Sequence, residues 1–421
     1  MSTFDDLFQA KDDLYEQWNL TALPFAESAE KLQQLSQVFT GRRDELSQVI
    51  NQFSSRDAKS ILVYGWIGIG KTAFVREVLE GYDRNLGDRV LTASIKLEPH
   101  TDLATAALIA LAREMPHDDW AQFQLNRLGL RPDRDLYNRT TTAGANMVFQ
   151  GTVEEQRVNP EAPQFPNLSF EDLLERAMAK HDRVIIAIDD LDKQDPAVAR
   201  QLLLNAQGLL KGRAWFLFTG HPSGITRDYL IRDRGLFDLA LELGPLDEDT
   251  SYTMLKNYLA SARRHPPDPD DEAAAVHPFT PATARDICRV AEGVPRWLNR
   301  MASYVLLKAV DLKAPQITPE VLQAGLDHAR DKLKGQPGLT PQDYYVFEMV
   351  LERRILSDDT ITLAELEQLK MEAFSEIMPI LDKLVAADLL KRLPTERASA
   401  YAPMPLLNAD AAPPAAPDDP S

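Results

Sequence analysis

Eight consecutive residues have the types and spacing that bind a triphosphate. They follow the pattern G-x-x-x-x-G-K-T and are Gly65, Trp66, Ile67, Gly68, Ile69, Gly70, Lys71 and Thr72. Because glycine adopts backbone conformations closed to other residues, successive N–H groups can turn inward around phosphate oxygens. We expect Lys71 to reach the β- and γ-phosphates and the Thr72 hydroxyl to ligate Mg²⁺.

A pair of carboxylates predicts the second half of such a site. Asp189 and Asp190 directly follow the apolar run 184–188, which is typical of a buried strand. A carboxylate at this position holds Mg²⁺, usually through water, so we assign Asp189 to the metal and Asp190 to the attacking water. Acidic residues after an apolar run are also common in solvated loops, but the upstream motif favours the catalytic interpretation.

Charge on a transferring phosphoryl group must be neutralised by further polar or cationic side chains. Thr219 ends the apolar run 215–218 and is placed to touch the γ-phosphate or the attacking water, or to cap a turn. Arg232 and Arg234 precede another apolar run, and Arg296 opens a helix in the segment Gly-Val-Pro-Arg. The alternative for each arginine is a solvated surface position.

The elements that must position these residues alternate between strand and helix. Predicted strands cover 61–64, 90–97, 184–188, 215–218 and 238–243, and an Ala/Leu-rich helix covers 103–113. This order predicts an α/β fold in which helices cover both faces of a parallel sheet.

An insertion is predicted between the two halves of the site. Lys71 and Asp189 are 118 residues apart, whereas two strand–helix units need only about 60. We place the excess at about 116–170, as an inserted subdomain with a hairpin around 148–158 that presents a partner surface, or as a disordered spacer.

The chain beyond residue 245 changes to a helical pattern. Segments 248–264, 281–292, 294–311 and 318–334 predict a small bundle, and 340–400 predicts three helices and a short hairpin. The predicted boundaries are 1–40 for a helical lead segment, 41–245 for the α/β core, 246–335 for the bundle, 336–402 for the terminal module and 403–421 for a disordered Ala/Pro/Asp-rich tail.

Composition limits the classes of function. The 421 residues contain one cysteine, Cys288, which excludes an internal disulfide and a four-cysteine zinc site. The first residues are acidic and no apolar run reaches eighteen residues, so we expect a soluble cytoplasmic protein with no membrane partner. The net charge of −18, and of −5 over 340–400, disfavours DNA as a partner without excluding a local basic groove.

The order of these motifs resembles a known family. The loop 65–72, the strand end Ile188-Asp189-Asp190-Leu191-Asp192, Thr219 and the Gly-Val-Pro-Arg helix start occur in that sequence, ahead of the terminal module. This is similar to AAA+ ATPases of the origin-recognition/initiator type and to the related STAND ATPases, over about 20–400. The resemblance implies a P-loop NTPase three-layer sandwich followed by an α-helical lid and a winged-helix-like domain.

The resemblance also implies individual roles. Phe39 and Arg42 would flank the adenine, Thr219 would be the first sensor, and Arg296 would be a second sensor on the lid. Arg234 or Arg232 would be a finger inserted into the site of a neighbouring subunit. The chain has Gly220-His221-Pro222 where STAND members often carry an arginine, so the branch within the family stays open.

Three functions are compatible with these observations. The first is a slow, regulatory, Mg²⁺-dependent ATPase that acts as a switch controlling assembly with itself and with a partner protein. The second is a DNA-binding ATPase that loads or selects a DNA target, of the initiator or transposition type. The third is a nucleotide-locked scaffold with negligible turnover.

Overall fold

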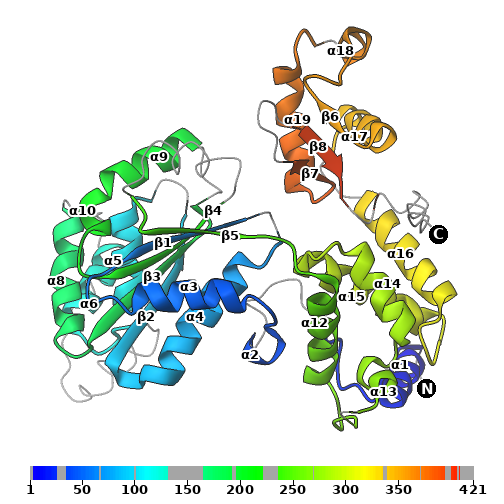
Figure 1. Ribbon diagram of the computed structural model, residues 1–421, viewed down its shortest axis with the longest axis horizontal. Coiled ribbons are helices and arrows are strands. Elements are labelled where there is room, and N and C mark those ends of the chain that lie inside the picture. The colour runs from blue at the N-terminus through cyan, green and yellow to red at the C-terminus, as the bar shows by residue number, and fades with distance from the viewer. Residues whose placement is uncertain are drawn as a thin grey trace, which may run out of the picture. The chain divides into compact units, whose positions relative to one another are not determined.

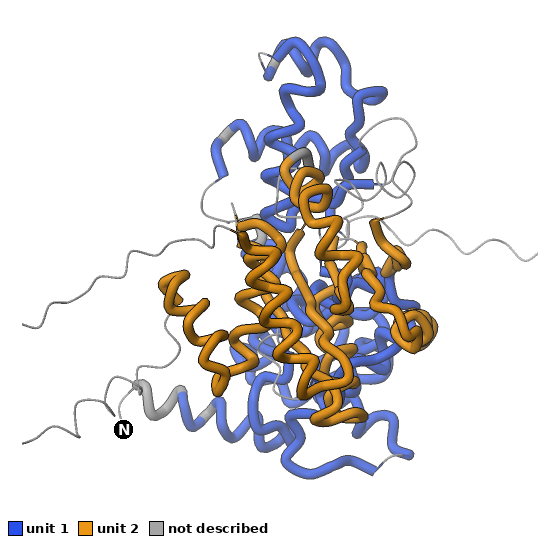
Figure 2. The backbone as a smooth tube through the Cα atoms, turned by 90° about the vertical axis from the view of Figure 1, so that its left-hand side faces the viewer, with its two compact units in different colours: residues 1–41, 68–70, 245–421 blue, residues 42–67, 71–244 orange. Residues whose placement is uncertain are grey.

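The computed structural model describes residues 3–25, 35–65, 68–98, 101–130, 165–191, 196–220, 236–268, 270–334, 339–369, 371–393, 400–404 and 407. The chain divides into two compact units (Figure 2). The core unit comprises 42–67 and 71–244, and the helical unit comprises 1–41, 68–70 and 245–421. Each unit is described by itself.

The core unit is built on a five-stranded parallel sheet. Its strands are β1 (Ser60–Gly65), β2 (Val90–Lys96), β3 (Arg183–Asp189), β4 (Trp215–Gly220) and β5 (Leu239–Leu243). They pair in the order β2-β3-β4-β1-β5, and every pair is parallel. The most central strands are continuous apolar runs because helices cover both of their faces. The predicted P-loop NTPase α/β fold is confirmed.

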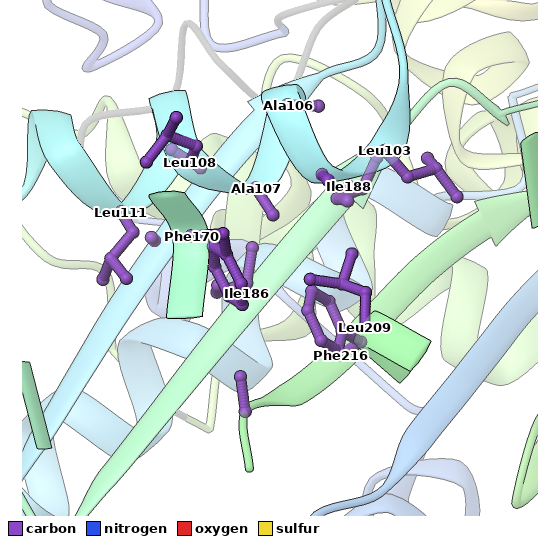
Figure 3. Packing of buried hydrophobic residues seen from close by; sticks show 14 of the residues in the cluster. Leu103, Ala106, Ala107, Leu108, Leu111, Phe170, Ile186, Ile188, Leu209 and Phe216 are labelled. Atoms are coloured by element: carbon purple, nitrogen blue, oxygen red, sulfur yellow. The ribbon is translucent and has the colours of Figure 1, made fainter. Parts of the chain in front are cut away.

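Helices cover both faces of this sheet, and the apolar side chains buried on one face form a different cluster from those on the other. The helices are α3 (Arg43–Phe53), α4 (Lys71–Leu86), α5 (Leu103–Arg113), α6 (Asp119–Arg127), α8 (Pro166–Met178), α9 (Pro196–Asn205) and α10 (Gln207–Leu210). Helices α5 and α8 pack on one face, where Leu108 and Phe170 meet Ile186 and Phe216 (Figure 3). The buried side chains of α3 and α4 lie outside that cluster, and these helices cover the other face (Figure 1).

The structure describes both ends of the interval predicted as an insertion. Helix α6 and the first part of α8 lie within 116–170, and their Ala121, Leu125 and Phe170 are buried in the core cluster. Both ends of the interval are therefore core. The stretch 131–164, with the predicted hairpin at 148–158, lies outside the described residues.

The helical unit contains the bundle predicted after residue 245 and part of the N-terminal segment. Its helices are α1 (Thr3–Gln17), α2 (Leu35–Val38), α12 (Glu248–Ser261), α13 (Glu272–Val276), α14 (Pro281–Val290), α15 (Pro295–Asp311) and α16 (Pro319–Lys334). The Trp18 indole donates to the carbonyl of Pro315 at 3.0 Å, and the Thr21 N–H donates to Ala262 at 2.8 Å. These bonds hold the chain before residue 25 on the bundle, about 240 residues or more away in sequence.

The C-terminal elements form a small α+β module in the same unit. They are α17 (Pro341–Arg353), β6 (Leu356–Ser357), α18 (Leu363–Leu369), α19 (Phe374–Ala386), β7 (Leu390–Leu393) and β8 (Ala400–Pro403). The strands pair antiparallel in the order β6-β8-β7. Two ion pairs hold this module on the bundle, Arg300–Asp388 at 3.0 Å and Lys391–Glu292 at 2.8 Å. Among the described helices, none combines the length and apolar character needed to cross a membrane.

Candidate functional site

Three side chains meet at the carboxyl edge of the core sheet. The Thr72 hydroxyl donates to Oδ2 of Asp189 at 2.7 Å, and the Thr219 hydroxyl donates to Oδ1 of the same carboxylate. Strands β3 and β4 are parallel neighbours, so their carboxyl ends bring Asp189 and Thr219 together. The carboxylate of Asp189 therefore joins Thr72, the other predicted metal ligand, to Thr219, the predicted first sensor.

Asp190 has an unusual backbone conformation beside this group. Its φ is +66°, in the left-handed region, which costs a non-glycine residue about 1–3 kcal/mol. Its N–H donates to Oγ1 of Thr219 at 3.0 Å, and that bond helps to fix the conformation. The strain thus falls on the residue predicted to orient the attacking water.

Lys71 opens helix α4 on the same side of the core unit. Its Nζ donates to the carbonyl of Gly65 at 2.9 Å, across the ends of the predicted phosphate loop. Helix α4 is sixteen residues long, and the first N–H groups of such a helix lack intrahelical partners and carry partial positive charge. This arrangement suits a phosphate anion. Trp66 and Ile67 lie outside the described residues.

The glycines of the loop lie against the start of α15 in the helical unit. Gly68 and Gly70 have φ of +82° and +99°, conformations that L side chains rarely adopt. The Gly68 carbonyl accepts the N–H of Arg296 at 3.2 Å, and a Cβ at Gly68 would lie 3.0 Å from the Cβ of Arg296. Arg296, which is predicted to be a second sensor, therefore lies beside Gly68 within the helical unit. Its guanidinium makes no ion pair with the described residues.

Arg42 is engaged in local contacts. Its guanidinium contacts Glu45 at 3.1 Å and the carbonyl of Gly244 at 2.5 Å, and its side chain is only 8% exposed. It thereby ties the start of α3 to the chain after β5. Phe39, the other residue predicted on the adenine side, follows α2 in the helical unit. The structure gives the two residues in separate units.

The remaining predicted residues define the limits of the site. Arg232 and Arg234 lie outside the described residues. The described part of the chain has no group of three or more His, Cys, Asp or Glu side chains that could hold a metal. Magnesium keeps several waters and substrate phosphates among its ligands. Thr72 and Asp189 with a triphosphate would therefore suffice.

The glycine of the Gly-Val-Pro-Arg segment makes a close backbone contact. Gly293 has φ +72°, and a Cβ there would lie 2.0 Å from the carbonyl oxygen of Leu246. Its own carbonyl accepts the Leu246 N–H at 2.9 Å. The close approach fixes the segment that leads into Arg296. The Gly before Val-Pro-Arg was the available signal, because an unreplaceable glycine often marks such contacts.

Comparisons with known proteins give one matching domain family and several similar structures. Residues 38–212 match the family described as AAA ATPase domain. The ORC1 protein of Aeropyrum pernix, solved in complex with DNA, has a similar structure, with a TM-score of 0.50 and 14% identity over 93% of this chain and 95% of that one. Cdc6p of Pyrobaculum aerophilum has a TM-score of 0.40 and 15% identity, over 94% of this chain and 96% of that one. The RuvB motor of Thermotoga maritima has a TM-score of 0.39 and 15% identity, over 89% of this chain and 97% of that one. No curated protein sequence matches the chain.

Proposed function

We propose that this chain, whose residues 38–212 form an AAA ATPase domain, is an ATP-driven switch that controls assembly with itself and with a partner protein. One observation carries the proposal. Asp189 accepts hydrogen bonds from both Thr72 and Thr219 at the sheet edge where α4 begins. These hydrogen bonds connect Thr72, at the end of the predicted phosphate loop, to the acidic end of strand β3.

Each side chain has a distinct role in this proposal. Lys71 would leave the Gly65 carbonyl for the β- and γ-phosphates, and Thr72 and Asp189 would hold Mg²⁺, which neutralises phosphate charge. Asp190, with its backbone fixed by Thr219, would orient the attacking water. Thr219 is 1% exposed, which favours a role in positioning the two acids over open contact with solvent.

We propose that the bundle acts as a lid and that the terminal module, a winged-helix-like domain, reports the nucleotide state. Helix α15 carries both features that support this. Arg296 lies at its start beside Gly68, and Arg300 is paired with Asp388 of the module one turn later. A shift of α15 on nucleotide exchange would therefore move the module. The side chains of Arg300 and Asp388 are 15% and 13% exposed, so water and salt weaken their attraction less than they would at the surface.

ATP binding tests the site assignment directly. Lys71→Ala should weaken binding of Mg-ATP in titration calorimetry by at least about tenfold, because a charge-assisted contact contributes more than 1.4 kcal/mol. Lys59→Ala is the matched control, since Lys59 precedes β1 and pairs with Asp238 away from the loop. Wild-type affinity in Lys71→Ala would show that the site is assigned wrongly.

The assembly role needs a separate measurement. Light scattering with ADP, ATP and a slowly hydrolysed analogue should show a larger particle in at least one triphosphate state. Arg232→Ala or Arg234→Ala should remove that change if either residue acts across a subunit boundary. A monomer in all three states would contradict the assembly proposal.

DNA binding is a second candidate because a fold of this kind was solved with DNA. The charge argues against it, since the chain is −18 and residues 340–400 are −5. Fluorescence anisotropy with a labelled duplex at 50 and 200 mM salt decides between the two. Salt-sensitive binding that also stimulates ATP hydrolysis would favour the DNA-loading function.

A further inference from the structure

The core unit has a hollow at the edge of the sheet where its strands begin. The hollow measures about 510 Å³ and opens between α3 and α4, beside Asp182 and Arg183 at the start of β3 (Figure 1). The residues proposed to bind the triphosphate lie where β3 ends, at Asp189. Helix α4 runs from one place to the other, and its sixteen residues span about 24 Å. The hollow is therefore distinct from the triphosphate site.

The inner wall of the hollow is largely aliphatic and partly open. Leu46 and Ile50 line it from α3, and Val78 and Leu86 line it from α4. Ile50 is 51% exposed, whereas Val78 in the same wall is 4% exposed. Because removing apolar surface from water is favourable, an apolar side chain that enters the hollow and covers Ile50 would gain affinity there.

A row of cations runs along the same edge of the sheet. Four adjacent strands each begin at a basic residue or within two residues after one. In the strand order β2-β3-β4-β1 these residues are Arg89, Arg183, Arg213 and Lys59, which we call the basic row. Neighbouring strands lie about 4.8 Å apart, so the row is about 14 Å long. Arg89 and Arg183 also line the hollow, which therefore opens beside the row.

The charge of this edge is opposite to that of the chain. The segments that lead into the five strands are 55–59, 84–89, 180–183, 211–213 and residue 238. They contain eight Lys or Arg and four Asp side chains, a net charge of +4, whereas the whole chain carries −18. An acidic partner is therefore attracted to this edge and repelled by the rest of the surface on average.

Two arginines of the basic row have donors for a further carboxylate. The described residues bond Arg89 only through its Nε, to Asp182 at 2.8 Å, and the two side chains are 71% and 61% exposed. A guanidinium has five N–H donors, so the two Nη groups of Arg89 can bind a second acid. Arg213 is exposed and makes no hydrogen bond or ion pair with the described residues. An incoming carboxylate gains a partner at either position.

The remaining groups at the hollow favour an acidic peptide over a nucleic acid. Glu77 in the wall already pairs with Arg84 at 2.6 Å, and Arg183 donates to the carbonyl of Phe53. Phosphates and sugars are hydrophilic and would leave the aliphatic wall around Ile50 uncovered. A peptide can place an apolar side chain in the hollow and carboxylates on the row at the same time.

We propose that the hollow and the basic row bind an extended segment of a partner protein that presents an apolar side chain beside two carboxylates. The apolar side chain covers Ile50, and the carboxylates bind Arg89 and Arg213. These arginines are two strands apart, about 10 Å, which an extended chain covers in three residues at about 3.3 Å each. The two acids therefore stand three positions apart. The site is independent of ATP hydrolysis.

Methyl NMR of the full-length protein, labelled at isoleucine methyl groups, tests this directly. The probe is acetyl-Leu-Glu-Ala-Ala-Glu-amide, and the peptide with glutamine for both glutamates has the same shape without the charges. The acidic peptide should shift the Ile50 signal, assigned with Ile50→Val, and should bind at least about threefold more tightly than the neutral peptide. This difference should shrink in 0.5 M salt. Replacing the leucine of the probe with alanine should abolish the Ile50 shift.

Two protein variants locate the contacts. Arg89→Gln combined with Arg213→Gln should remove the difference between the acidic and neutral peptides, because both proposed partners of the carboxylates lose their charge. Arg113→Gln is the matched control and should preserve the difference. Arg113 is also exposed, but it ends α5, which packs on the other face of the sheet.

Several results would overturn the proposal. They are an unmoved Ile50 signal at millimolar acidic peptide, equal affinity of the two peptides, or wild-type discrimination in the double variant with its other isoleucine signals unchanged. Isovalerate binding as tightly as the peptide would identify a small anion as the ligand instead. A short DNA duplex that shifts the Ile50 signal at lower concentration than the peptide would identify a nucleic-acid site. ATP affinity measured on the same samples separates these failures from a failure of the proposed ATPase.

Discussion

Replacing Gly293 with alanine should strongly destabilise the helical unit. A left-handed φ of +72° alone costs an alanine about 1–2 kcal/mol. The new Cβ would lie 2.0 Å from the oxygen and 2.7 Å from the nitrogen of Leu246, and both are backbone atoms that cannot rotate away. Separating the segments also strains the 2.9 Å hydrogen bond between them, worth about 1 kcal/mol. These two terms sum to about 2–3 kcal/mol, and the steric overlap adds to them.

Thermal and urea unfolding followed by tryptophan fluorescence measures this loss. Two glycines serve as controls, because a Cβ at either meets nothing within 4 Å. Gly87→Ala, at φ +53°, should cost only the backbone strain of about 1–2 kcal/mol. Gly208→Ala, inside α10, should be neutral or stabilise by about 0.5–1 kcal/mol. If Gly293→Ala unfolds no earlier than Gly87→Ala, the steric argument is refuted.

Three further predictions concern buried polar groups. Asp388→Asn should lower the stability of the helical unit by about 3 kcal/mol in urea unfolding, because it removes the carboxylate charge that faces the shielded Arg300 guanidinium; a loss below 0.5 kcal/mol would contradict this. Burial raises the pKa of Asp343, but hydrogen bonds from Lys383 and the helix cap outweigh it, so its pKa is lowered. The ionised Asp343 side chain therefore stabilises the fold at neutral pH, and this contribution is lost as the pH falls through the lowered pKa. The difference in unfolding free energy between the wild type and Asp343→Asn should shrink over the same pH range. Burial raises the pKa of Cys288 to about 12, so iodoacetamide should react with it at pH 8 only after unfolding.

The sequence predicted the elements whose chemistry requires particular residues. A triphosphate loop needs its glycines, lysine and threonine at fixed spacing, and a parallel sheet covered on both faces needs continuous apolar strands. Residues 38–212 match the AAA ATPase domain, in line with the resemblance, and the STAND-like branch stays a prediction. The apolar residues at helical spacing around Cys288 predict a buried thiol, and Cys288 is 2% exposed.

Long-range packing could not be predicted in the same way. Nothing in the composition of 3–25 indicates that Trp18 bonds to Pro315 or that Thr21 bonds to Ala262. Helix α6 within the predicted insertion could not be recognised from the sequence, because it carries only Ala121, Gln124 and Leu125 as buried residues, too few for a clear apolar period. The left-handed Asp190 was not foreseen either, since its conformation depends on Thr219, 29 residues later.

We propose that Asp190 activates water beside the hydrogen-bonded group of Thr72, Asp189 and Thr219. Steady-state release of phosphate from Mg-ATP tests it, with the affinity for ATP measured on the same samples. We expect the wild type to turn over and Asp190→Asn to bind ATP normally but to release phosphate at least about 100-fold more slowly. No release from the wild type, or an unchanged rate in Asp190→Asn, would show that Asp190 does not activate water and would favour a nucleotide-locked scaffold.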